Sequence, residues 1–192
     1  MTTNNKNYDT TKDMIIDKAI SLFQNKGYMH VSVKDICDEC GITRGAFYYY
    51  YKTKDEILDD IFIVSDHLSA QTMSKILDSH NYIEQFYNLH NIYFQRTLEV
   101  GPEIMGQVLK RYIDKGTKLA EPKDVAVYEM YVTLIKKAQD AGQIYNMTSA
   151  RLLAENVIHL TNGLGLIWSS RKGDFNFAEE FYKLSDAIFI RK

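Results

Sequence analysis

GITRGAFYYYYKTK, residues 41–54, is the stretch of the sequence that decides the fold. Thr43 is a good N-cap, and it predicts a short helix on which Phe47 and Tyr51 lie four residues apart on one face. The charged residues of this stretch are all basic: Arg44, Lys52 and Lys54. A local excess of positive charge suits contact with phosphate groups.

Two more helices are predicted before this stretch. An apolar stripe on residues 11–26 indicates an amphipathic helix, and Gly27 ends it. Ser32 is a plausible N-cap for a second helix of about two turns that ends at Gly41. Two short helices joined through a glycine turn, after a longer amphipathic helix, form the pattern of a helix-turn-helix unit.

Residues 41–56, GITRGAFYYYYKTKDE, resemble the signature of the tetracycline-repressor (TetR) family. The preceding Gly27-Tyr28 and the segment SVKDI at residues 32–36 are similar to the family in the same register. The resemblance covers about the first sixty residues. It implies an all-α protein, with a three-helix helix-turn-helix DNA-binding domain at residues 1–54 and a helical effector-binding and dimerisation domain at residues 55–192. It further implies a homodimer whose third helices bind the major groove of a palindromic operator in double-stranded DNA.

The chemistry of these residues agrees with that role. Thr43 opens the recognition helix, and its hydroxyl is expected to face a phosphate or a base edge. Arg44 is suited to a bidentate contact with guanine, which contributes about 1–3 kcal/mol of base discrimination. Gly45 is costly inside a helix, and close approach of DNA would explain it. Tyr48 and Tyr49 are expected at phosphates through their hydroxyls. The full set of expected DNA-binding residues is Ser32, Lys34, Thr43, Arg44, Gly45, Ala46, Tyr48, Tyr49 and Lys54.

Several residues of this unit differ from the usual residues of the family, or are expected to pack in the core rather than to bind DNA. Phe47 and Tyr51 are expected in the core. The place of Tyr50 is often histidine in the family, which leaves its role open. Cys37 and Cys40 stand where alanine is common, and both lie on the apolar stripe of their helix. We interpret them as small buried core residues, with a thiol-based redox-sensing regulator as the alternative.

The rest of the chain is predicted to be helical, with helices at residues 57–79, 82–98, 102–113, 123–141, 149–170 and 177–190 and a loop at residues 115–122. The last two carry apolar residues at alternating steps of three and four, which is typical of bundle helices. In the TetR family these two helices form a four-helix dimer interface. The candidates for that interface are Leu153, Val157, Leu160, Leu164, Phe181, Leu184 and Ile188. Packing within one chain is the alternative.

Aromatic residues with polar groups are frequent between residues 82 and 131. A pocket lined by such side chains suits a small, mainly apolar effector with one or two polar groups. The candidates are His90, Tyr93, Met105, Tyr112, Tyr128, Asn162 and Trp168, and core packing is the alternative for each. The family's usual mechanism is that an inducer shifts the separation of the two recognition helices, which releases the repressor.

Other classes of protein find less support. The sequence contains no Gly-rich phosphate loop, no H-E-x-x-H and no G-x-S-x-G, and its five histidines lack metal-ligand spacing. We therefore expect that the protein is not an enzyme and that it binds neither a cofactor nor a metal ion. No run of residues reaches the roughly 20 apolar residues of a membrane helix, so a cytoplasmic protein without a membrane partner is expected. The nearest alternative is a helical ligand- or protein-binding module that has lost DNA binding.

Overall fold

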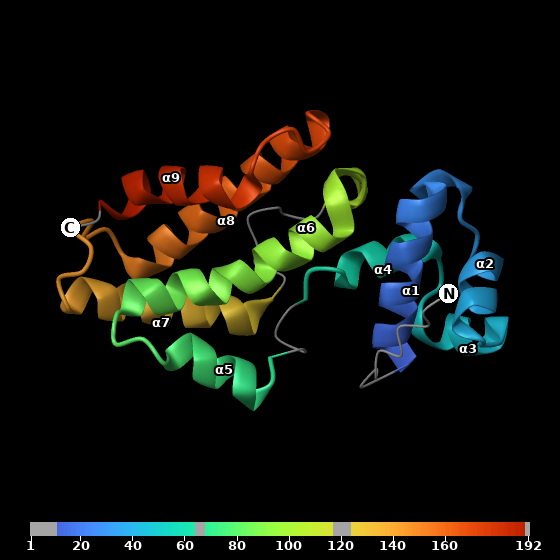
Figure 1. Cartoon of the computed structure of the whole chain (residues 1–192), viewed down its shortest axis with the longest axis horizontal. Coiled ribbons are helices and arrows are strands. Elements are labelled where there is room, and N and C mark those ends of the chain that lie inside the picture. The colour runs from blue at the N-terminus through green and yellow to red at the C-terminus, as the bar shows by residue number, and fades with distance from the viewer. Residues whose placement is uncertain (1–10, 64–67, 117–123, 191–192) are drawn as a thin grey trace. The chain divides into compact units, whose positions relative to one another are not determined.

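The computed structural model describes residues 11–63, 68–116 and 124–190. These residues form α-helices and one short 3-10 helix, and this described part contains no β-strand. The all-α prediction is confirmed. The chain divides into two compact units between Ile61 and Phe62 (Figure 1).

The first unit contains α1 (Thr11–Lys26), the 3-10 helix η1 (Tyr28–His30), α2 (Val33–Cys40), α3 (Arg44–Tyr50) and α4 (Lys54–Asp60). Gly27 separates α1 from η1 with a φ of 80°, and Gly41 ends α2 in the left-handed conformation with a φ of 65°. Glycine adopts such positive φ angles without a steric penalty, so both turns follow from the sequence. The fully buried side chains of this unit are Ile15, Ala19, Phe23, Ile36, Phe47 and Ile57.

Helix α4 belongs to the first unit. Its apolar residues Ile57 and Leu58, and Ile61 just after it, are buried, and α4 packs against α1. The Asp60 carboxylate accepts a hydrogen bond from the Tyr51 hydroxyl at 3.0 Å. The division therefore falls after residue 61, later in the chain than the domain boundary expected after residue 54.

The second unit contains α5 (Ala70–Leu77), α6 (Tyr82–Asp114), α7 (Val125–Asp140), α8 (Ala150–Ser170) and α9 (Phe177–Phe189). Helix α6 packs against the other four, and α8 packs against α6, α7 and α9. Gly101 interrupts α6 with a φ of 81° and a ψ of 168°, directly before Pro102 (Figure 1). The break lies between the two helices expected at residues 82–98 and 102–113, so the structure joins them as one kinked helix.

The single helix expected at residues 57–79 is wrong. Helix α4 ends at Asp60, and α5 begins at Ala70 after Ser69, whose hydroxyl accepts a hydrogen bond from the Thr72 amide at 3.1 Å. Such a serine N-cap starts a new helix rather than continuing an old one. Most of the loop expected at residues 115–122 lies outside the described residues, as does residue 123, the expected start of the next helix.

Across the described segments, no helix has the combination of length and apolar character that crossing a membrane requires.

Candidate nucleic-acid interface

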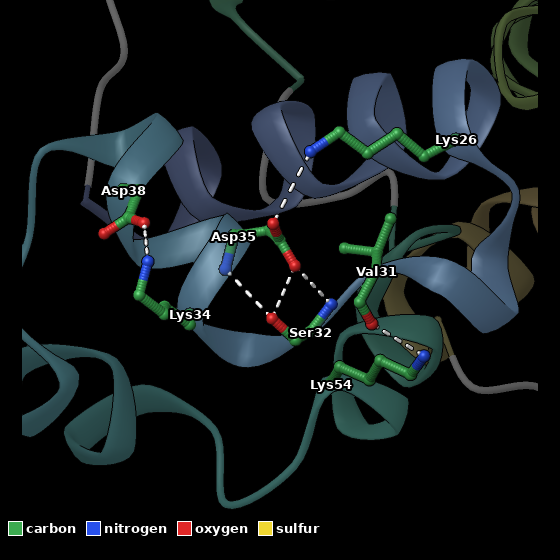
Figure 2. Close-up of polar contacts among 7 residues, drawn as sticks. All are labelled: Lys26, Val31, Ser32, Lys34, Asp35, Asp38 and Lys54. Atoms are coloured by element: carbon green, nitrogen blue, oxygen red, sulfur yellow. Dashed lines mark hydrogen bonds and ion pairs between the residues drawn. The ribbon is translucent and has the colours of Figure 1, made fainter.

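Helix α2 begins with a reciprocal capping box. The Ser32 hydroxyl oxygen accepts the Asp35 amide at 3.2 Å, and the Asp35 carboxylate accepts the Ser32 amide at 2.9 Å (Figure 2). The same carboxylate accepts the Ser32 hydroxyl proton. These hydrogen bonds from Ser32 lower the pKa of Asp35 to about 2. Both donors of Ser32 thus bind Asp35, and its expected phosphate contact would have to compete with that carboxylate.

Helix α3 is anchored by one face. The Thr43 hydroxyl accepts the Ala46 amide at 3.1 Å, which satisfies a donor of the first turn. Phe47 is 0% exposed and Tyr51 is 3% exposed, which confirms that these two residues belong to the core. Burial raises the pKa of Tyr51 far above its usual value, and the adjacent Asp60 carboxylate adds to this effect. The opposite face of α3 consequently points away from the packed unit.

That outward face carries most of the predicted DNA-binding residues. Arg44 and Gly45 are exposed, and Ala46 is half-buried. A Cβ atom added at Gly45 would meet only the Thr43 hydroxyl oxygen, at 3.8 Å, so packing within the chain does not require glycine there. Three neighbouring aromatics are also exposed: Tyr48 at 53%, Tyr49 at 82% and Tyr50 at 38%. Exposed apolar surface of this kind indicates an interaction site.

The tyrosines are held by ring contacts. Tyr48 packs edge-on against Phe47, with ring centres 5.7 Å apart, and Tyr49 packs edge-on against Tyr50, with ring centres 5.0 Å apart. Tyr50, whose role the sequence left open, therefore lies at the surface beside Tyr49.

Lys34 and Lys54, the two lysines predicted to contact DNA, differ in the groups that their ammonium ions bind. The Lys34 ammonium lies 2.8 Å from the Asp38 carboxylate, and both side chains are exposed (Figure 2). An exposed pair of this kind contributes little stability, so Lys34 can exchange Asp38 for a phosphate. Lys54 instead donates to two backbone carbonyl oxygens, those of Tyr28 at 2.7 Å and Val31 at 2.8 Å. This arrangement departs from the phosphate contact expected for Lys54, and no periodicity in the sequence signals it.

The cysteines lack the properties of reactive thiols. Cys37 is buried and Cys40 is half-buried. Burial raises the pKa of Cys37, and it raises the pKa of Cys40 to about 11. A thiol with a raised pKa stays protonated and is a poor nucleophile at neutral pH, which favours a core role over redox sensing.

In the second unit, His90 lies at the centre of an aromatic core. Its Nδ1 is 2.7 Å from the Tyr131 hydroxyl and its Nε2 is 3.3 Å from the Thr161 hydroxyl. The imidazole stacks on Phe181 with ring centres 4.3 Å apart. Burial lowers the pKa of His90 to about 3, so the ring is neutral at pH 7. Tyr131 and Thr161 were not among the predicted effector residues, because only the folded arrangement brings them to His90.

The remaining effector candidates are distributed through the core of the second unit. Tyr93 lies beside His90, with ring centres 5.7 Å apart. Trp168 is buried and donates its indole N–H to the Phe175 carbonyl at 3.1 Å. Two more candidates, Met105 and Tyr128, are buried, and the last two, Tyr112 and Asn162, are half-buried. The seven residues are thus spread over α6, α7 and α8, and their binding of an effector stays a prediction.

Four of the seven dimer candidates are core residues of the chain itself: Leu153, Val157, Leu164 and Phe181, each at most 5% exposed. Packing within one chain, the alternative named above, accounts for these four, because they belong to the hydrophobic core of the second unit. Their part in a dimer interface stays a prediction. Leu160 and Ile188 are half-buried and Leu184 is 37% exposed. Periodicity found the apolar stripe of each helix but could not identify what covers it.

The first unit matches the family model described as "Bacterial regulatory proteins, tetR family" over residues 15–61. An uncharacterised HTH-type transcriptional regulator, YerO of Bacillus subtilis, is 43% identical over 47 residues, which are 24% of this chain and 16% of YerO. The chain therefore matches about a sixth of that relative's length. The HTH-type transcriptional regulator UidR of Escherichia coli is 20% identical over 159 residues, or 80% of this chain and 79% of UidR.

The fold is similar to that of Thermus thermophilus FadR, a TetR-family transcriptional repressor solved in complex with lauroyl-CoA. The TM-score is 0.67 and the identity 16%, over 92% of each chain. The relatives are transcriptional regulators rather than enzymes, in agreement with the expectation from the sequence. The family model, these relatives and the all-α fold agree: residues 15–61 match the tetR family of bacterial regulatory proteins, and the chain as a whole is similar to regulators with that fold.

Proposed function

We propose that this regulator binds a palindromic DNA operator as a homodimer through the outward face of α3, and that it acts as a repressor. The observation that carries the proposal is the exposure of Arg44, Gly45 and Tyr49 on α3, where Gly45 and Tyr49 lie opposite the buried Phe47 and Tyr51. Arg44 supplies donors for a guanine edge. Gly45 leaves the surface flat where a Cβ would have met nothing but the Thr43 hydroxyl. Tyr49, at 82% exposed, offers a hydroxyl and a ring to the DNA backbone.

The proposed homodimer is supported by leucine side chains that one face of α8 leaves exposed at its two ends. Leu152 is 45% exposed and Leu166 is 56% exposed, and the helical repeat places both on one face with Gly163. Ile167, the next residue of α8, is also exposed, at 49%. A second copy packed on this face would remove it from water, which is the usual reason for such a patch.

An effector that releases the operator is the second part of the proposal. The observation that supports it is the polar group His90–Tyr131–Thr161 inside an aromatic core, since a mainly apolar ligand needs a few such partners. FadR, which has a similar fold, was solved with lauroyl-CoA. A ligand with an apolar chain or ring system is the class that we would screen first.

The experiment is selection of bound duplexes from a random pool with the full-length purified protein. The proposal expects enrichment of an inverted repeat whose half-sites are about one helical turn, or a multiple of it, apart. It expects affinity for the winning duplex to fall steeply as salt rises, because phosphate contacts release counterions. Equal, weak binding to all duplexes would instead favour a helical ligand- or protein-binding module.

A further inference from the structure

Lys54, the first residue of α4, holds the turn that leads into α2. Its Nζ donates to the carbonyl oxygen of Val31 at 2.8 Å (Figure 2). It also donates to the carbonyl oxygen of Tyr28 at 2.7 Å and lies 4.4 Å from the centre of the Tyr28 ring. An ammonium has three N–H donors. Two carbonyls and the face of a ring therefore provide a partner for each of them.

Tyr28 is itself fixed from two sides. Its ring is 5% exposed and packs edge-on against Phe23 of α1, with ring centres 4.8 Å apart. Its hydroxyl donates a hydrogen bond to the Asp55 carboxylate, next to Lys54 in α4. The contacts of Tyr28 thus join η1 to both α1 and α4.

Val31, whose carbonyl Lys54 binds, directly precedes the N-cap Ser32. The capping partner of Ser32, Asp35, is in turn 3.5 Å from the Lys26 ammonium at the end of α1 (Figure 2). The start of α2 is therefore held by a lysine from α1 on one side and by a lysine from α4 on the other. Helix α2 packs against α3, so whatever fixes α2 also fixes α3.

We propose that Lys54 is a positioning residue rather than a phosphate contact: it fixes the entry to α2 and so the orientation of the α2–α3 pair on DNA. The proposal rests on the DNA-binding function proposed above. A phosphate contact and a positioning role make different predictions, because only the first adds a released counterion to the salt dependence.

The test compares the wild type with Lys54→Met, which keeps an unbranched side chain of nearly the same length and removes the ammonium group. Lys52→Met, which removes an exposed lysine two residues earlier, shows what loss of charge alone does. Binding to the selected duplex and to a random duplex is measured by fluorescence anisotropy at four salt concentrations, at a temperature where circular dichroism shows every variant folded. Hydrogen exchange of the backbone amides is measured on the same proteins without DNA.

For Lys54→Met we expect about ten-fold weaker binding to the selected duplex, a smaller preference over the random duplex, and an unchanged slope of log Kd against log salt. Without DNA, we expect about ten-fold faster exchange at residues 32–36 than in the Lys52→Met control. A slope lowered by about 0.9 with unchanged preference would show a phosphate contact and overturn the proposal. Unchanged affinity, or unchanged exchange at residues 32–36, would also overturn it.

The two proposals fail in distinguishable ways. If the wild type binds no duplex preferentially, the proposed DNA-binding function fails. The exchange measurement then still decides whether Lys54 fixes the entry to α2, because it needs no DNA.

Discussion

At the scale of single residues, Gly45 stands out because nothing in the chain explains it. It lies exposed in α3, where an added Cβ would meet only one atom, at 3.8 Å. Glycine inside a helix is less stable than alanine by about 0.5–1 kcal/mol. The chain thus carries a destabilising residue on its proposed DNA-binding face, and the proposed close approach of DNA would explain it.

Gly45→Ala is expected to make the folded protein more stable and its binding to DNA weaker. The free energy of unfolding, measured with urea, should rise by about 0.5 kcal/mol because the helix gains propensity without a clash. Affinity for the selected duplex should fall about ten-fold or more, since the methyl group occupies space that DNA needs. The control is Thr133→Ala on the exposed side of α7, which should raise stability slightly and leave binding unchanged. Equally tight binding by Gly45→Ala would remove Gly45 from the interface.

Single residues also show what the sequence could and could not reveal. The spacing of Phe47 and Tyr51 identified two core residues, because neighbours on one helix face share an environment. The positive charge of Lys54 and the resemblance both predict a phosphate contact. In the structure, the Lys54 ammonium donates instead to the backbone carbonyls of residues 28 and 31, which lie near it only in the folded unit. A long flexible side chain has no periodicity that would reveal such a partner.

At the scale of elements, the hydrogen bonds of His90 tie three helices together. His90 belongs to α6, Tyr131 to α7 and Thr161 to α8, and the imidazole lies between their hydroxyls. Burial lowers the pKa of His90 to about 3, against an ordinary value of 6.5. Between these two values the unfolded chain binds a proton that the folded chain does not. Protonation therefore favours unfolding, and stability rises with pH across this window.

His90→Gln is expected to flatten this pH dependence. From pH 6.5 down to about 3 the wild type should lose on the order of a few kcal/mol more than the variant, because glutamine does not titrate. The measurement is urea unfolding of both proteins at a series of pH values. His80→Gln, at an exposed histidine, is the control and should follow the wild type. Identical pH profiles for the wild type and His90→Gln would show that His90 is not the group responsible.

Element boundaries followed from the sequence where a specific residue sets them. Ser32 and Thr43 cap α2 and α3 as expected, and Gly41 ends α2. The break between α4 and α5 was missed because the apolar stripe of residues 57–79 runs through it in the sequence. Ser69 caps α5 there, but a serine within an apparently continuous stripe is a weak signal before the fold is known.

At the scale of the whole molecule, the proposed operator complex needs two copies of the chain. Helix α8 has one apolar face that is buried within the chain, and another face that exposes Leu152 and Leu166. Sequence periodicity indicated the first, which the chain already covers with its own helices. The second was not recognised because Leu152 and Leu166 are fourteen positions apart, with a glutamate, a histidine and a glycine between them on the same face.

Leu166→Glu is expected to convert the dimer into a monomer. A carboxylate buried between two copies would be costly without a partner, whereas the single chain leaves Leu166 56% exposed. Mass from light scattering checks this, with Leu98→Glu on α6, 49% exposed, as the matched control that should stay dimeric. Binding of the inverted repeat should weaken with the monomer, because two linked half-site contacts bind more tightly than one. A wild-type monomer, or a dimeric Leu166→Glu variant, would contradict the proposed interface.

The most direct test of the central claim is the base preference of Arg44→Ala. Wild type and variant are titrated, by fluorescence anisotropy, against the selected duplex and a panel in which each base pair is changed in turn. We predict that the variant loses about 1–3 kcal/mol of discrimination at one base position in each half-site and keeps its preference elsewhere. The same preference profile for both proteins would contradict the claim that α3 contacts the bases through Arg44.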